Sequence, residues 1–222
     1  MFNIFYFKKV FSTMDVIKDY PPNTVIVAEK QTKGRGKQVR NWVSEDSQNV
    51  YMSLKIDIKG ENYANHVFRT GLVVLEAIER SLGKLNLELK WPNDILLNGK
   101  KIGGILLEKD GDNLTIGLGL NINSSPTKTL FRASSLKDEG FILDKKVFLK
   151  NFLEEFGRHR MDSFETVRKK WLARAYNLGK EITANIGDEI FCGIFENLDD
   201  NGFLTLRRQN GEIMKIFSGD VF

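Results

Sequence analysis

The chain has 222 residues, 41% of them hydrophobic and 28% charged, with a formal net charge of +4. This length supports one sizeable core with room for a small second domain, and the composition excludes a disordered or collagen-like protein. The mild basic excess suits a phosphate-bearing ligand but is too small for a dedicated nucleic-acid-binding protein.

The single cysteine, Cys192, excludes a disulfide framework within the chain and a cysteine-based zinc site. A reducing cytoplasm is therefore the expected compartment. The apolar start "MFNIFYFKKVF" is interrupted by Lys8 and Lys9, is too short to span a membrane and lacks the features of an export signal. We expect it to form a buried strand, and we expect no membrane association.

Two strands should flank a basic segment. "TVIVAEK", residues 24–30, is rich in β-branched residues, and "NVYMSLKID", residues 49–57, alternates apolar and polar positions. Between them, "KQTKGRGKQVRNW" (residues 30–42) has five basic residues, two glycines and no acidic residue. Such a segment cannot build a core. Repulsion among its cations predicts a loop that is loose when empty and closes on an anion.

A helix with one buried face is expected over residues 67–82, followed by a strand over residues 85–91. Asn98 and Gly99 predict a tight hairpin. The hairpin leads into two strands that carry glycines in their interiors, at positions 103, 104, 117 and 119. Glycine in a strand marks either a close approach by a ligand or another backbone, or a bulge or tight packing against a helix. Glycines on both strands favour a ligand-binding floor.

Residues 146–172 have a helical pattern with aromatic residues at the expected core positions: Phe148, Phe152, Phe156, Phe164 and Trp171. Beyond Tyr176, short strand-like runs separated by glycine-containing turns predict a small antiparallel barrel. We therefore predict an α+β domain over residues 1–177, built on a mixed sheet, and a second domain over residues 178–222.

Common catalytic motifs are absent from the sequence. His66 and His159 are the only histidines, and neither lies in a recognisable motif, so a serine or cysteine triad and a histidine-rich metal site are not expected. Both histidines are interpreted as surface or helix residues. Neither G-x-x-x-x-G-K-S/T nor G-x-G-x-x-G occurs, so any nucleotide must be held in another way.

Three sets of cations remain: the basic loop, Lys90 before "WPND", and Lys101 before the first glycine pair. Converging on a glycine floor, they would bind nucleotide phosphates and stabilise the charge that develops when a carboxylate attacks an α-phosphate. Asn93 and Asp94 offer oxygen ligands to a nucleotide's Mg²⁺. The alternatives are a nonspecific RNA-binding loop, core roles for the tryptophans, and a solvated Lys90.

Two segments together resemble a known family. "GRGKQVRNW" resembles the pattern G-R-G-R-x-G-R-x-W, and "KWPNDILLNGKKIGGILLE" closely resembles the K-W-P-N-D segment of biotin–protein ligases with its K-x-x-G-I-L-x-E continuation. Ser12-Thr13 occupies the place of the family's S-T-N motif, and "GLGLN" looks like its G-x-G-x-N strand. The tail resembles the family's small SH3-like barrel. The resemblance covers nearly the whole chain and implies a biotin/lipoate-ligase catalytic domain followed by that barrel.

The resemblance implies a two-step activity. Biotin and ATP, with Mg²⁺, would give biotinyl-5′-AMP and pyrophosphate. The biotinyl group would then pass to a lysine of the biotin carboxyl carrier protein of a biotin-dependent carboxylase, with acetyl-CoA carboxylase as the family default. No covalent enzyme intermediate is needed, in keeping with the absent triad.

The resemblance also implies site residues at the matching positions. Lys90 and Arg35 would be catalytic. The residues implied in biotin binding are Ser12, Thr13, Gln31, Gly36, Lys37, Lys90, Gly104 and Gly117. The residues implied in nucleotide binding are Arg35, Lys37, Trp42, Asn93, Lys101 and Asn121, with Asp94 on the magnesium of ATP.

Three positions depart from the family pattern. Met14 replaces the usual asparagine after Ser-Thr and removes one polar contact. Lys37 stands where arginine is usual, so the charge is kept but the planar fork is lost. Val39 replaces a loop glycine and should stiffen the loop. None of them removes the central cations, so we expect activity to persist.

Bifunctional members of the family carry an N-terminal helix-turn-helix domain and repress biotin synthesis. Here the Ser-Thr motif begins at residue 12, so we expect no specific DNA binding. A homodimer formed edge to edge through the central sheet is compatible with the resemblance. The rival interpretations are a lipoate–protein ligase or octanoyl transferase, and a nonenzymatic RNA- or nucleotide-binding module whose binding weakens steeply with salt.

Overall fold

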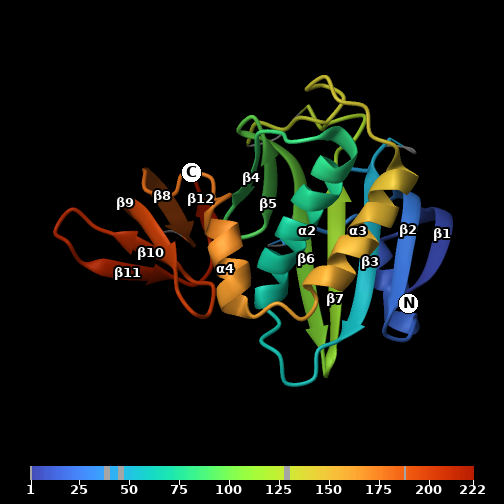
Figure 1. The fold of residues 1–222 in the computed structure, drawn as a ribbon, viewed down its shortest axis with the longest axis horizontal. Coiled ribbons are helices and arrows are strands. Elements are labelled where there is room, and N and C mark those ends of the chain that lie inside the picture. The colour runs from blue at the N-terminus through green and yellow to red at the C-terminus, as the bar shows by residue number, and fades with distance from the viewer. Residues whose placement is uncertain (1, 38–40, 45–47, 128–130, 188) are drawn as a thin grey trace.

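A computed structural model describes residues 2–37, 41–44, 48–127, 131–187 and 189–222. Its larger part is a seven-stranded sheet (Figure 1), with strands β1 (Asn3–Val10), β2 (Thr24–Gln31), β3 (Val50–Asp57), β4 (Leu87–Lys90), β5 (Asp94–Leu97), β6 (Lys100–Asp110) and β7 (Asn113–Leu120). The strand order is β1-β2-β3-β7-β6-β5-β4, with β1 and β2 parallel and the other neighbours antiparallel. The predicted α+β class with a mixed sheet is confirmed.

The first strand forms as predicted, but the prediction that it is buried is wrong. Ile4, Phe5 and Tyr6 are 38%, 41% and 64% exposed. The reason is position, because β1 is the last strand of the sheet and lies beyond most of the helical cover (Figure 1). Among its aromatic neighbours, Phe2 reaches the core, where its ring packs edge-on against Phe156.

Helices α2 (Asn65–Leu82) and α3 (Lys145–His159) cross one face of this sheet, and α4 (Phe164–Leu172) follows beside α2 (Figure 1). The predicted apolar stripes are buried; Phe148, Phe152 and Phe156 are 0% exposed. The long helical pattern is broken after α3, and Ser163 caps α4 through its side chain. Gly71 of α2 allows close packing, because an added Cβ would lie 3.0 Å from Leu89.

The predicted hairpin forms between β5 and β6. Asn98 and Gly99 have φ values of 52° and 72°, the left-handed conformation that a two-residue primed turn requires. The turn fixes the register in which β6 returns along β5, and so places Lys101 and Gly104 near the "WPND" segment.

The C-terminal part is a five-stranded antiparallel sheet with the order β11-β10-β9-β8-β12. Its strands are β8 (Glu181–Ile186), β9 (Glu189–Leu198), β10 (Leu204–Arg207), β11 (Ile213–Ile216) and β12 (Asp220–Val221). All four predicted runs form strands, β12 was not predicted, and the hydrogen-bonded order leaves the barrel open. Trp91 joins the two parts by donating from Nε1 to the Gly202 carbonyl at 3.1 Å.

Two short elements complete the N-terminal part: the helix α1 (Thr13–Val16) and the 3-10 turn η1 (Ile17–Asp19). Both contact β2 and β3. Within the described ranges, no helix is long and apolar enough to cross a membrane.

Candidate active site

A cavity opens between α1, the basic loop, the glycine-bearing strands and the last residues of the chain. All but one of the residues predicted for the site line it: Ser12, Thr13, Gln31, Arg35, Gly36, Lys37, Trp42, Lys90, Asn93, Asp94, Lys101, Gly104 and Gly117. These residues come from segments up to about half the chain apart in sequence, so the sheet register assembles them.

The polar end of the cavity is built around Thr13 and Gln31. Gln31 Oε1 accepts from the Thr13 backbone N–H at 2.8 Å and lies 3.1 Å from Thr13 Oγ1. Ser53, which the sequence did not single out, lies 2.8 Å from Thr13 Oγ1 through its hydroxyl. Ser12 is 0% exposed, yet its Oγ has no hydrogen-bond partner among the described residues. An unpaired buried hydroxyl is costly, so this end is suited to a polar ligand.

Gly104, Gly117 and Gly119 form a floor of the cavity, whereas Gly103 does not line it and lies beside a register shift between β5 and β6. Gly104 lies opposite Gly119, and the β6–β7 ladder keeps a regular register from Gly103 to Asp110. An added Cβ at Gly104 would lie 3.1 Å from the Trp42 ring, and one at Gly117 would lie 2.6 Å from the Met14 sulfur. Met14 and Trp42 therefore lie on glycines where a larger residue would not fit. Trp42 Nε1 is also buried with no partner in the described structure.

Two lysines lie at the other end. Burial lowers the pKa of Lys90 below its usual value of 10.5; the charge of Lys101 acts in the same direction, and Asp94 opposes it. Lys90 Nζ lies 5.2 Å from the Phe222 ring centroid. Lys101 Nζ pairs with Asp94 Oδ1 at 2.5 Å, so this end of the cavity holds partly compensated positive charge.

The described part of the basic loop is held by carboxylates from elsewhere in the chain. Arg35 pairs with Asp15 of α1 at 2.9 Å and with Glu108 of β6 at 2.7 Å. These carboxylates lie outside the segment and offset part of the repulsion expected among its cations. Val39 and Arg40 lie outside the described residues, so the expected stiffening at Val39 stays a prediction.

Asn121 is the predicted site residue that does not line the cavity. It is 3% exposed, and its amide donates to the Ser134 carbonyl at 3.0 Å. Conversely, Phe131 and residues 220–222 line the cavity without having been predicted. The sequence held no local signal for them, because Phe131 is placed by the pairing of its segment with Lys101. The place of residues 220–222 depends on how the C-terminal sheet docks.

The two histidines lie elsewhere, on the helices. His66 is buried, and burial together with the Arg69 charge lowers its pKa to about 4. The expectation of a helix residue is therefore met, although His66 is not on the surface. His159 ends α3 and is half-buried.

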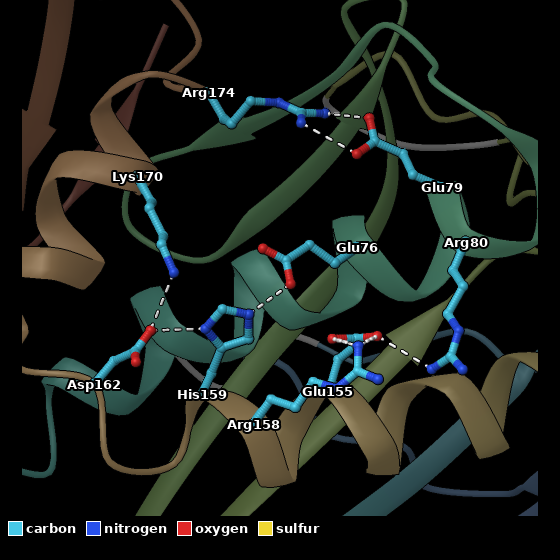
Figure 2. Close-up of polar contacts among 9 residues, drawn as sticks. All are labelled: Glu76, Glu79, Arg80, Glu155, Arg158, His159, Asp162, Lys170 and Arg174. Atoms are coloured by element: carbon cyan, nitrogen blue, oxygen red, sulfur yellow. Dashed lines mark hydrogen bonds and ion pairs between the residues drawn. The ribbon is translucent and has the colours of Figure 1, made fainter.

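Figure 2 shows that His159 lies between two carboxylates, with Nε2 2.5 Å from Glu76 and Nδ1 2.7 Å from Asp162. Glu76, Glu155 and His159 have ligand atoms within 4.8 Å of one another, as a metal site would require. Both ring nitrogens are already bonded, however, and Glu155 pairs with two arginine side chains. We assign this cluster to holding α2, α3 and the start of α4 together.

Comparison with known proteins identifies the family. Residues 7–122 match the model of the Biotin/lipoate A/B protein ligase family. The chain belongs to this family. Residues 178–222 match the Biotin protein ligase C terminal domain, so both parts of the chain match family models.

The chain is 32% identical over 217 residues to the Bifunctional ligase/repressor BirA of Bacillus subtilis, a match that covers 90% of this chain and 66% of the relative. The chain therefore spans about two thirds of that relative's length. It is also 32% identical over 204 residues to the Biotin--[acetyl-CoA-carboxylase] ligase of Paracoccus denitrificans, covering 84% of this chain and 85% of the relative.

Its fold matches that of the biotin protein ligase from Aquifex aeolicus in complex with biotin and ATP, with a TM-score of 0.86, 31% identity and coverage of 99% of this chain and 97% of the other. The resemblance to the biotin–protein ligase family that the sequence motifs indicated is therefore confirmed.

Proposed function

We propose that this chain activates biotin with ATP to biotinyl-5′-AMP and transfers the biotinyl group to a lysine of a biotin carboxyl carrier protein. One observation carries the proposal: one cavity has at one end the buried Ser12 hydroxyl, which has no partner in the described parts of the chain, and two lysines at the other. Such a cavity matches an uncharged polar ring joined through a chain to a carboxylate, with a nucleotide phosphate beside the lysines.

The proposed chemistry follows from those lysines. The biotin carboxylate attacks the α-phosphate of ATP, a bond forms from carboxylate oxygen to phosphorus, and pyrophosphate leaves. Negative charge builds on the phosphoryl oxygens, and Lys90, which lines the cavity in a partly desolvated position, would stabilise it. In the second step the carrier lysine attacks the acyl carbon, AMP leaves, and the amine loses a proton.

A magnesium ion accompanying ATP is a further part of the proposal. Asp94 and Asn93 line the cavity and carry the oxygen donors that Mg²⁺ prefers. Asp94 already pairs with Lys101, so a cation there would share this carboxylate with the lysine. The residues fit the ion, whose contribution would be to neutralise phosphate charge.

The partner we propose is the carrier subunit of a biotin-dependent carboxylase, in keeping with the name of the Paracoccus relative. We also propose residues 1–177 and 178–222 as the two domains and a reducing cytoplasmic compartment, since the single cysteine is free. A homodimer stays a prediction.

The test is biotin-dependent exchange of labelled pyrophosphate into ATP with magnesium, comparing the wild type with a Lys90→Ala variant. Exchange that needs biotin and is lost or much reduced in the variant is the expected result. Exchange with lipoate only would move the chain to the lipoate branch. No exchange with either acid from folded protein would contradict the proposal, and binding that weakens steeply with salt would then favour the nucleic-acid module.

A further inference from the structure

The Arg35 guanidinium lies between two carboxylates from distant parts of the chain. Its Nη1 and Nη2 face the two oxygens of Glu108 at 2.7 and 3.1 Å, which is a bidentate fork. Nη2 also pairs with Asp15 Oδ1 at 2.9 Å. Asp15 belongs to α1 and Glu108 to β6, so Arg35 joins three segments beside the cavity. We call these three residues the arginine clamp.

The clamp reduces the attraction of Arg35 for a phosphate group. Two carboxylates surround the one guanidinium, and Lys18 lies 3.6 Å from the same Asp15 oxygen, so the group is close to neutral and Arg35 offers a phosphate little net positive charge. Lys90 and Lys101 line the other part of the cavity. These lysines are therefore better suited than Arg35 to bind phosphates.

The clamp leaves one donor of Arg35 unused. Both terminal nitrogens are taken, whereas Nε is buried and has no hydrogen-bond partner among the described residues. Arg35 lines the cavity, as does Ser12, whose Oγ is also buried without a described partner. Asp15, which pairs with Arg35, lies in the short helix α1, and Ser12 is the residue immediately before that helix. The clamp therefore lies toward the polar end of the cavity.

We propose that Asp15 and Glu108 are positioning residues, which fix the Arg35 guanidinium so that its Nε–H donates to an oxygen of the bound acid while the described part of the basic loop is held over it. The proposal rests on the proposed function, because it takes the acid to be bound at the Ser12 end. It assigns Arg35 a directional contact with the acid in place of a charge contact with the nucleotide.

Kinetics of the Glu108→Gln variant test the proposal. Glutamine keeps the size of the side chain but loses the charge-assisted fork. In pyrophosphate exchange, KM for biotin should rise about tenfold, equivalent to about 1.4 kcal/mol, with kcat and KM for ATP changed less than about twofold. Asp15→Asn should act in the same direction, more weakly, because it removes one contact. A purely structural role would not separate the two substrates.

The matched control is Glu154→Gln. Glu154 also pairs with an arginine, Arg80 at 2.6 Å, but on the helical face and outside the cavity. The KM values of the Glu154→Gln variant for biotin and for ATP should match those of the wild type. The proposal would be overturned if, in Glu108→Gln, KM for ATP rose as much as KM for biotin. It would also be overturned if KM for biotin were unchanged in that variant.

A second measurement does not depend on activity. In the ligand-free protein, hydrogen exchange of the backbone amides of residues 33–37 should be faster in Glu108→Gln than in the wild type and in Glu154→Gln. Equal rates would overturn the clamp. If the wild type shows no biotin-dependent exchange of pyrophosphate into ATP, the proposed function fails. The hydrogen-exchange comparison alone then decides whether these carboxylates position the loop.

Discussion

The indole of Trp42 packs directly on Gly119. A Cβ added at this glycine would overlap three atoms of the ring, and one added at Gly104 on the neighbouring strand would lie 3.1 Å from it. The two glycines are cross-strand partners, so together they form a flat seat for one aromatic side chain. The seat explains why two strands carry glycine where β-branched residues would otherwise be favoured.

Replacing Gly119 by alanine should displace Trp42 from the cavity. Overpacking typically costs about 1–3 kcal/mol, and we expect KM for ATP in pyrophosphate exchange to rise by roughly tenfold or more. Gly157→Ala is the control, because Gly157 lies exposed in α3 and an added Cβ meets nothing within 4 Å. That variant should keep its activity and gain about 0.5–1 kcal/mol of stability. Unchanged kinetics in Gly119→Ala would contradict the assignment of the seat.

The Lys90→Met variant should lose biotin-dependent pyrophosphate exchange and yet have a more stable fold than the wild type. Burial lowers the pKa of Lys90, so the charged side chain opposes folding at neutral pH. Methionine fills the space without a charge, so we expect the Tm of the variant to be higher than that of the wild type.

The sign of the pH dependence follows from the lowered pKa of Lys90. The cost is full below the folded-state pKa, where the lysine is charged in both states, and it is gone above the unfolded value of 10.5, where it is neutral in both. The stability difference between Lys90→Met and the wild type should therefore shrink as pH rises. Calorimetry at neutral and alkaline pH would measure it; a variant less stable at neutral pH would contradict the account.

His66 should make the protein sensitive to acid. Its pKa is lowered from 6.5 to about 4 by burial and by the Arg69 charge, against the opposing effect of Glu61. Above pH 6.5 the group is neutral in both states and contributes nothing. Between pH 6.5 and about pH 4 the unfolded chain binds the proton more readily than the folded protein. The free energy of unfolding therefore decreases as the pH is lowered, by about 3 kcal/mol in total.

A His66→Gln variant should lose less stability over this range, because glutamine does not titrate. Urea unfolding of both proteins at about pH 7.5 and about pH 4.5 gives the comparison. Parallel losses in the two proteins would show that other groups, and not His66, account for the acid sensitivity.

The Gly219→Ala substitution in the small sheet should disturb the cavity and so reduce activity. Gly219 has φ 138°, and an added Cβ would overlap the Asn185 carbonyl oxygen. The shift would move residues 220–222, which line the cavity. It would also disturb the Gly219 carbonyl, which accepts from Lys37 Nζ at 3.2 Å. We expect kcat/KM for ATP to fall about tenfold, a loss of about 1.4 kcal/mol.

Gly211→Ala is the control for strain alone. Gly211 also has a positive φ, 84°, but an added Cβ there meets nothing within 4 Å. It should lower stability modestly and leave kcat/KM unchanged. Equal losses of activity in the two variants would mean that general destabilisation, and not the placement of residues 220–222, is responsible.

The sequence alone was sufficient for features that depend on near neighbours in the chain. Apolar residues at helical spacing predicted α2 and α3, and Asn98-Gly99 predicted the hairpin because this pair accepts positive φ values. The motifs at residues 34–42 and 90–108 led to the family, which the comparisons confirmed. The interior glycines predicted a ligand-binding floor, and Gly104, Gly117 and Gly119 line the cavity.

Only the tertiary structure decided the exposure of β1, the clamp on Arg35 and the part that residues 220–222 take in the cavity. Arg35 and Glu108 are 73 residues apart, and their ion pair exists because β6 runs beside the loop in one particular register. Charge and hydropathy patterns record what each residue is, but not which distant side chain will neutralise it. Local periodicity therefore predicts the elements, whereas sheet order and docking determine their partners.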